Sequence, residues 1–442
     1  MAEKRANVPG MAAGRRGGPI GRSRFGLAVS AWSLQTFESM SNGSLRILWF
    51  GTLLNFGAIT MNGTAQGVVA FDLTGNNKAV GAVMFGQGLS MLFISPFAGA
   101  LADRFSKRLM LVTCQAILGI QFFLVGSAIA TDTITIPMLA VSSFVSGTMF
   151  AVIRPVRNAY IGELASPEQR GNAVAVQQLA MTGMQIIGPF MAGILLGWNA
   201  VGSAGTYLAM GLFVVFSLLL MFQLPGTKSR VMQAGGPSFV QEMWGGIRYG
   251  YGNPEIRWVL GGFILVTIVG TPYMVLLPAY TKDVLGMSTA SLGVLLGISA
   301  AGGFIVSLAT ASMAGSSKAP TILTCCNILL AASLVGLAFA PSFAVAALAV
   351  FFLGAGAGGF QMLNTAIALQ AAEVAYMGRV AALTMMTFSL SGLVAFPIGA
   401  LADAHGERAV FAGMGIAVFV VAIFLALWKK QMIRAKASAQ AA

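Results

Sequence analysis

The residue types that carry out most enzyme chemistry are scarce in this sequence. It has one histidine, His405, and no cysteine or serine lies close to it in the sequence to complete a catalytic pair or a zinc site. The three cysteines, Cys114, Cys325 and Cys326, fall in apolar stretches, where we expect them to pack rather than to bind metal or form disulfides. We therefore expect neither an enzyme nor a bound cofactor.

A second candidate is the stretch GAGAGG at 354–359, which has the spacing of a dinucleotide-binding loop. It lies inside an apolar run with no strand before it, so the setting that such a loop requires is missing. We interpret it as a site of close helix packing or bending.

Asn, Gln and Thr side chains are spaced along the apolar runs instead. Asn55, Asn62 and Gln66 stand at i, i+7 and i+11, which places them on one face of a helix. Shorter stripes of the same kind are Gln177, Gln178, Thr182 and Gln185, and later Gln361, Asn364 and Thr365. Polar side chains of a membrane helix face the bundle interior or a wet cavity. These residues are predicted to line a substrate cavity, and interhelical hydrogen bonding is the alternative.

The elements that carry these stripes are membrane helices. Hydrophobic residues make up 57% of the 442 residues, charged residues only 9%, and the mean hydropathy is +0.82. A helix needs about 20 apolar residues to cross the hydrocarbon core. Such runs occur at 45–72, 79–102, 109–130, 134–159, 172–198, 203–224, 257–280, 288–313, 320–340, 343–370, 378–401 and 408–428. Six runs, a polar interruption and six more predict two joined halves.

The basic residues follow this topology. Lys78, Lys282 and Arg408 fall on one side of the predicted membrane, and the other 23 of the 26 Lys and Arg residues fall on the side that holds both termini. The positive-inside rule then places both termini in the cytoplasm of a multi-pass protein of the cell (inner) membrane. It also accounts for the net charge of +13 without a nucleic-acid partner.

The chain divides into five parts on this reading. Residues 1–44 form a cytoplasmic tail, disordered or lying on the membrane, and 429–442 form a second cytoplasmic tail. Bundles of six helices span 45–224 and 257–428. The linker at 225–256 contains SFVQEMWGGIRYGY, whose Ser238 and Gln241 have capping-box spacing, so it is predicted to form an amphipathic helix on the inner leaflet.

Few ionisable groups fall within the runs. Asp72 ends the first run on the outside and is our candidate for proton coupling, because external water can reach it. Arg154 and Arg157 lie near the cytoplasmic end of the fourth run, where long side chains can snorkel to the surface. We expect them to anchor the helix, and Arg154 is kept as a second coupling candidate.

The stretch GALADRFSKR follows the second run. It resembles the loop signature of the major facilitator superfamily, with Gly99, Asp103, Arg104, Lys107 and Arg108 in the matching places and Ser106 where that family usually has Gly. The resemblance implies that the aspartate braces the two halves on the cytoplasmic side, at the start of the eleventh span. We expect Asp103 to dock there and to pair with Arg379 in the state closed to the cytoplasm.

Further stretches narrow the resemblance. Residues 154–195, 253–297 and 377–403 look like the corresponding loops and spans of the macrolide-efflux and enterobactin-exporter branch of drug:proton antiporters. Gly188, Pro189 and Gly193 match part of the signature that such exporters carry in the fifth span, with Ala192 in place of one glycine. The signature favours export, and a structural kink without directional meaning is the alternative.

The sequence GALAD occurs twice, at 99–103 and at 399–403. The predicted topology places the two copies on opposite sides of the membrane. We assign the gate function to the first copy and helix packing to the second. Neutralising Asp403 is therefore expected to matter little unless it guards the outer mouth.

Together these features predict an all-α membrane protein with twelve spans in two six-helix bundles, rocking around a central cavity. The resemblance implies export of a small amphiphilic or hydrophobic compound, such as a drug or a siderophore, driven by proton exchange. We expect the partners to be the bilayer, a small-molecule substrate and protons, and the protein to act as a monomer. A transporter of a native metabolite or lipid, and a non-transporting sensor or scaffold, are the alternatives.

Overall fold

The computed structural model describes residues 38–167, 169–226, 245, 248–316, 318–373 and 376–441. The first 37 residues and most of the linker helix expected around Ser238 lie outside these ranges. Twelve of the described helices are long and apolar enough to cross a membrane, which confirms the predicted number of spans. The first six are α2 Gly43–Thr74, α3 Asn77–Arg104, α4 Lys107–Ala130, α5 Ile136–Leu164, α6 Arg170–Gly197 and α7 Gly202–Phe222.

The second six spans begin with a broken one. It consists of α9 (Pro254–Gly270), the short turns η2 (Pro272–Val275) and α10 (Leu277–Ala279), and the π-helical turn η3 (Tyr280–Val284). Pro272 and Pro278 lack the amide hydrogen that a continuous helix needs, so the helix changes course here. The others are α11 Thr289–Ala311, α12 Ala319–Ala338, α13 Phe343–Ala371, α14 Met377–His405 and α15 Glu407–Ala441.

Polar side chains define several helix starts. Asn42 accepts hydrogen bonds from the backbone N–H groups of Ser44 and Leu45 at the start of α2. Ser106 accepts one from Leu109 at the start of α4. Such caps satisfy backbone donors that a helix leaves unpaired, and they fix where each span begins.

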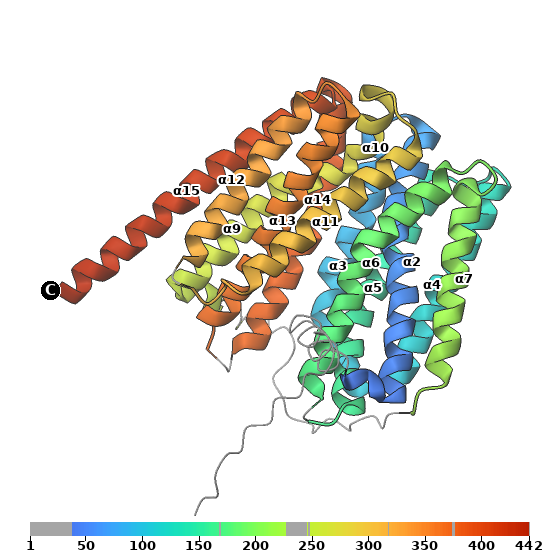
Figure 1. Ribbon diagram of the computed structural model, residues 1–442, viewed down its shortest axis with the longest axis horizontal. Helices are drawn as coiled ribbons and strands as arrows, with labels where there is room; N and C mark the ends of the chain where they lie inside the picture. The colour runs from blue at the N-terminus through green and yellow to red at the C-terminus, as the bar shows by residue number, and fades with distance from the viewer. Residues whose placement is uncertain are drawn as a thin grey trace, which may run out of the picture.

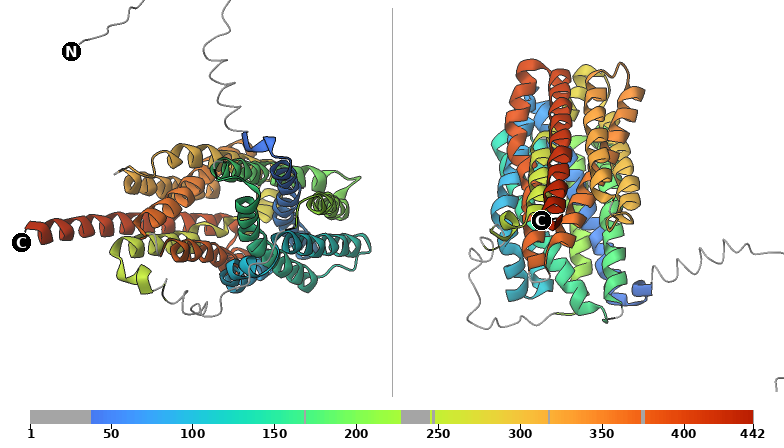
Figure 2. Two further views of the ribbon diagram at one scale, coloured as in Figure 1. Left: turned by 90° about the horizontal axis from the view of Figure 1, so that it is seen from below. Right: turned by 90° about the vertical axis from the view of Figure 1, so that its left-hand side faces the viewer.

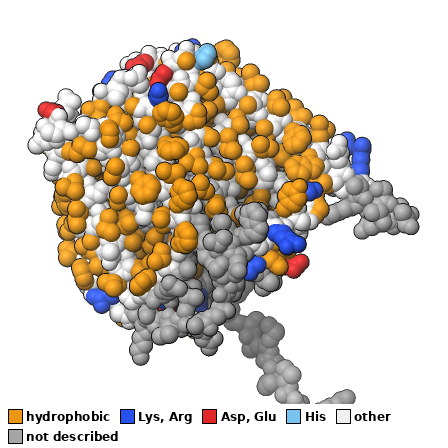
Figure 3. Space-filling view, turned by 180° about the vertical axis from the view of Figure 1, so that it is seen from behind, with side chains coloured by type: hydrophobic (Ala, Val, Ile, Leu, Met, Phe, Trp, Pro, Cys, Tyr) orange, Lys and Arg blue, Asp and Glu red, His pale blue; other side chains and the backbone are white. Residues whose placement is uncertain are grey.

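The helices α2–α7 lie on one side of the molecule and α9–α15 on the other (Figure 1). We call the end that holds the C-terminus of α2 the Asp72 end, and the end that holds the start of α4 the Lys107 end. Charged side chains gather near both ends, and hydrophobic side chains cover the band between them (Figure 3). Such an apolar band is what a protein surrounded by lipid exposes.

Two pairs of helices join the halves, α3 with α14 and α6 with α11. Gly88 of α3 faces Gly392 of α14, and a Cβ added to Gly88 would lie 2.8 Å from the Cα of Gly392. Gly193 of α6 faces Gly293 of α11 in the same way. Without side chains at these positions, the backbones of the two halves touch.

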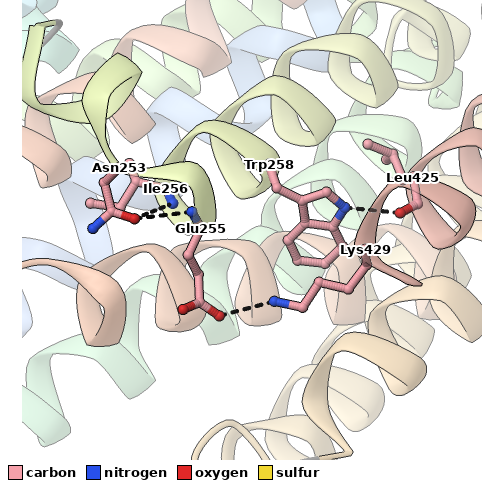
Figure 4. Close-up of polar contacts among 6 residues, drawn as sticks. All are labelled: Asn253, Glu255, Ile256, Trp258, Leu425 and Lys429. Carbon is pink, nitrogen blue, oxygen red and sulfur yellow. Dashed lines mark hydrogen bonds and ion pairs between the residues drawn. The ribbon is translucent and has the colours of Figure 1, made fainter. Parts of the chain in front are cut away.

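The last helix extends past the predicted span end at 428, through Lys429 and Lys430, and projects beyond the other helices (Figure 2). It is fastened to the start of α9 (Figure 4). Glu255 pairs with Lys429 at 2.9 Å, and the indole Nε1–H of Trp258 donates to the Leu425 carbonyl at 2.9 Å. These contacts join the first and last spans of the second half near the Lys107 end.

Candidate transport site and gates

The polar stripe of α2 lies inside the first half of the molecule. Asn62 donates to Ser146 at 3.2 Å and Gln66 donates to Ser142 at 3.4 Å, both serines being on α5. Gln121 of α4 donates to the same two serines at 2.8 and 2.7 Å. In this conformation Asn62 and Gln66 are buried and take part in interhelical hydrogen bonding, and a role in lining a cavity stays a prediction. Nothing in the sequence singled out Gln121, which stands apart from the polar stripes.

A second set of buried polar groups lies nearer the Lys107 end of the same half. Both amide atoms of Asn55 on α2 and of Gln115 on α4 are buried without a hydrogen-bond partner. The guanidinium of Arg157 on α5 also has two unpaired nitrogens, Nε and Nη2, although its side chain is only 2% exposed. The expectation that Arg157 snorkels to the surface is therefore wrong, because its side chain ends inside the protein.

A pocket opens beside Arg157 between α2, α5 and α6. It is lined by Phe56, Phe150, Ile153, Arg154, Arg157, Asn158, Gln178 and Met181. The Arg154 guanidinium lies 5.6 Å from the centre of the Phe150 ring. Gln178 and Asn158 are exposed at the pocket's edge. One predicted cavity residue, Gln178, and one coupling candidate, Arg154, thus meet at a single site.

The other stripes differ in exposure. Gln177 is buried and donates to Thr52 of α2, whereas Gln178 donates to Thr182 on an exposed face at 3.3 Å, and Gln185 is exposed. On α13, Asn364 is buried and donates to its own helix at the Phe360 carbonyl, and Gln361 is exposed. Of the exposed members, Gln178 lines the pocket beside Arg157.

The glycine and proline signature of α6 lies between two helices. Gly188 packs on Thr60 of α2, where an added Cβ would lie 2.9 Å from the Thr60 Cβ, and Gly193 packs on α11. Pro189 lies between them inside the helix. Gly188 thus packs within the first half, whereas the Pro189 carbonyl and Gly193 lie at the contact with α11 of the second half.

The structure describes only part of the stretch GALADRFSKR (residues 99–108), to which we assign the gate function. Lys107 is buried and pairs with Glu163 of α5 at 2.9 Å, and Arg108 donates to the Phe222 carbonyl at the end of α7 at 2.6 Å. Both contacts lie within the first half. The side chains of Gly99, Asp103 and Arg104 lie outside the described part, so their docking on the start of α14 stays a prediction.

Arg379, the expected partner of Asp103, lies in the first turn of α14. Its guanidinium stacks over the Tyr376 ring at 5.1 Å, and it lies close to Gly245 of the linker. The Tyr376 ring is in turn stacked on Tyr249 at 4.0 Å. The linker therefore reaches the start of α14.

The second GALAD copy does more than pack helices. Gly399 does lie against the backbone of Asn77. In addition, the Asp403 carboxylate accepts hydrogen bonds from the backbone N–H groups of Asn77 and Lys78 at the start of α3, at 2.7 and 2.9 Å. Glu407 accepts another from the Asn77 side chain at 2.7 Å. The assignment of this copy to packing alone was incomplete, because sequence does not show which helix start faces an aspartate.

Asp72 also bridges the halves at this end. Its carboxylate pairs with Lys282 of η3 at 2.9 Å, and both side chains are about half exposed. Two clusters of polar contacts, around Asp403 and around Asp72, thus cross the interface at this end. Together with the glycine contacts of α3 with α14, they close the interface from the Asp72 end toward the middle of the helices.

Twelve spans are thus arranged in two halves that meet at an interface lined by glycines. The family model described as the Major Facilitator Superfamily matches residues 48–396. The chain belongs to the Major Facilitator Superfamily. It is therefore a multi-pass membrane transport protein, and not an enzyme.

Two curated relatives are similar over part of their length. The staphyloferrin A transporter of Staphylococcus aureus (strain NCTC 8325 / PS 47) is 25% identical over 241 residues, which are 54% of this chain and 60% of that protein. Multidrug resistance protein 1 of Bacillus subtilis (strain 168) is 30% identical over 120 residues, 27% of this chain and 30% of that protein. The matched regions thus span less than two thirds of each relative.

Solved structures share the fold over most of the chain. The nucleoside transporter NupG has a TM-score of 0.70 at 13% identity, covering 87% of this chain and 99% of that one. A bacterial homologue of the human lysosomal transporter Spinster, in an inward-facing and unoccupied conformation, has a TM-score of 0.67 at 14% identity, covering 87% and 95%. At these identities the likeness concerns the fold alone.

Proposed function

We propose that this superfamily member is a secondary active exporter of a small amphiphilic or hydrophobic compound, driven by proton exchange. The observation that supports it best is the closed interface at the Asp72 end, where Gly88 meets Gly392 and Asp403 caps the start of α3. A transporter by alternating access needs an interface of this kind that can part. Residues 45–224 and 257–428 are the two bodies that rock in this proposal.

Orientation follows from charge. With 23 of 26 basic residues on the side of the termini, we propose that the Lys107 end is cytoplasmic and that the structure is closed to the outside. The protein then works as a monomer in the cell membrane, taking its substrate from the cytoplasm. The multidrug resistance proteins among its relatives support export, as do Pro189 and Gly193 of the export signature, which lie where α6 meets α11 of the other half.

Proton coupling is assigned to Asp72. Protonating this carboxylate from the outside removes its charge and so weakens its pair with Lys282, which joins the two halves. Loss of the pair favours opening at the Asp72 end, where bound compound is released. When this end closes again, the pair with Lys282 re-forms and Asp72 gives up the proton, which leaves on the cytoplasmic side to complete the exchange. Arg154 is the second coupling candidate, because its charge lies in the pocket beside Arg157.

The test is flux in proteoliposomes with a defined protein orientation. Ethidium and a fluorescent aromatic carboxylate serve as probes, and a pH gradient is imposed across the membrane. We expect movement of at least one probe from the cytoplasmic to the outer face, accelerated by outside acid and accompanied by proton movement. Movement that ignores the pH gradient would contradict the coupling, and no flux of any probe would favour a sensor or scaffold.

A further inference from the structure

A buried, unpaired charge is the least expected feature of the first bundle. The Arg157 side chain is 2% exposed, and its Nε and Nη2 atoms have no hydrogen-bond partner. Arginine stays charged in proteins, and burying a charge without a partner is strongly unfavourable. A guanidinium that served only to hold helices together would have carbonyl or carboxylate partners.

The surroundings of Arg157 supply the remaining parts of a site. The pocket beside it contains a second guanidinium, that of Arg154, and no Asp or Glu is among the described residues that line it. Its walls include the Phe56 and Phe150 rings, whose centres are 5.9 Å apart, and Met181. A positive, acid-free pocket with apolar walls suits an anion that carries an apolar body.

Asn55 adds an unpaired amide at the same level. The hydrogen bonds from Asn62 to Ser146 and from Gln66 to Ser142 set an antiparallel register between α2 and α5. Continued by two turns, this register brings Asn55 opposite Ile153, one turn from Arg157. Both amide atoms of Asn55 are buried and without a partner. Two of the buried groups without a partner, the Arg157 guanidinium and the Asn55 amide, therefore lie at the same level of the bundle, beside this pocket.

We infer that the pocket around Arg157 binds the carboxylate of the transported compound, so that the substrate is an anionic amphiphile. This inference rests on the proposed export function and narrows its substrate class. Guanidinium Nε and Nη2 form the fork that holds both oxygens of a carboxylate. The pocket lies toward the Lys107 end, and its exposed edge at Gln178 and Asn158 is where a cytoplasmic compound enters.

Binding of a matched pair of probes tests the site. The probes are 1-pyrenebutyrate and its uncharged primary amide, and pyrene fluorescence reports their affinity for the purified full-length protein in detergent. We expect the wild-type protein to prefer the acid by about ten-fold or more, the effect of a charge-assisted hydrogen bond. Equal affinity for the two probes would overturn the inference.

Variants of Arg157 test whether this residue causes the preference for the acid over the amide. Arg157→Gln should abolish it while leaving the affinity for the amide within about two-fold, and Arg157→Lys, which keeps the charge without the fork, should retain part of it. Arg257→Gln is the matched control, because Arg257 is exposed on α9 and stacks on Tyr251. An unchanged preference in Arg157→Gln, or in Arg157→Lys if the Gln variant does not fold, would overturn the inference.

The same chemistry fits an anionic lipid headgroup, so the binding is repeated in nanodiscs of phosphatidylcholine with and without phosphatidylglycerol. We expect the preference for the acid to survive in both. Arg157-dependent competition by phosphatidylglycerol would assign the pocket to lipid and overturn the substrate class. Binding is measured here without flux, so the two proposals can fail separately. Preference for the acid without transport of any probe would remove the export function and leave the pocket. Transport of ethidium by a protein that does not prefer the acid would leave export and remove the pocket.

Discussion

The carboxylate of Asp403 at the end of α14 accepts hydrogen bonds from the backbone N–H groups of Asn77, at 2.7 Å, and Lys78, at the start of α3. These residues are 326 positions apart in the sequence and belong to different halves of the molecule. A carboxylate at a helix start is stabilised by the unpaired N–H groups and by the positive end of the helix. The contact therefore acts as a clasp that holds the Asp72 end closed.

The clasp gives the first prediction. Asp403→Asn should shift the conformational equilibrium toward opening at the Asp72 end by about ten-fold, because hydrogen bonds to a charged group contribute about 1.5–3 kcal/mol. In a protein freed of its own three cysteines, labelling of a cysteine placed at Ala402, which is 2% exposed in this closed conformation, reports the opening. Asp283→Asn is the control, since Asp283 is exposed at the same end and makes no described contact across the interface. Equal labelling of the two variants would show that the clasp carries no conformational energy.

The crossing of α3 and α14 gives the second prediction. Gly392→Ala should reduce transport at least ten-fold, because the new Cβ would lie 2.7 Å from the Cα of Gly88 and backbone cannot move aside as a side chain can. Gly63→Ala, in α2 with open space around it, is the matched control and should transport normally. Initial flux rates at equal protein levels provide the measurement. Normal flux through the Gly392 variant would argue against a tight crossing.

The ion pair of Asp72 and Lys282 gives the third prediction. Its energetic contribution should be small, about 0–1 kcal/mol, because both side chains are about half exposed. Asp72→Asn should therefore change substrate affinity little. It should nevertheless abolish substrate-driven proton movement, because asparagine cannot take up a proton, and a pH-sensitive dye reports this movement. The Asp283→Asn protein again serves for comparison. Proton movement that persists in Asp72→Asn would remove Asp72 as the coupling residue.

The expected pairing of Asp103 with Arg379 at the Lys107 end gives the fourth prediction. We expect transport to be lost in Asp103→Arg and in Arg379→Asp and to be restored when the two changes are combined. Opposite charges would then face one another again at the start of α14 in the state closed to the cytoplasm. Arg248→Asp, an exposed charge reversal on the linker side, controls for loss of positive charge at that end. A double variant as inactive as the single ones would exclude the pairing.

The spans were the part of the fold most open to prediction. The apolar run at 109–130 becomes α4 (Lys107–Ala130), and 343–370 becomes α13 (Phe343–Ala371), because length and hydropathy alone determine what crosses a bilayer. The break after Gly270 was missed, although Pro272 and Pro278 in the run signalled it. The extension of α15 was missed because its charged residues carry no apolar signal.

The site was less predictable than the fold. The periodicity of Asn62 and Gln66 placed them on one face but did not show that Ser146 and Ser142 satisfy them within the bundle. Arg157 looked like a snorkelling residue near a helix end, and only the packing of α2 and α6 around it shows that it is buried. Likewise, GALAD at 399–403 has the same letters as the first copy, and only the tertiary fold identifies the helix start that faces it.

The central claim is that the two ends of the interface open alternately, and paired spin labels measure this most directly. Labels at Thr133 and Ala404 span the Asp72 end, and labels at Pro167 and Ser316 span the Lys107 end, all at exposed positions in a protein freed of its three cysteines. As the pH is lowered or the carboxylate probe is added, the account predicts that one distance lengthens while the other shortens. Distances that stay fixed under all conditions, or that lengthen together, would contradict it.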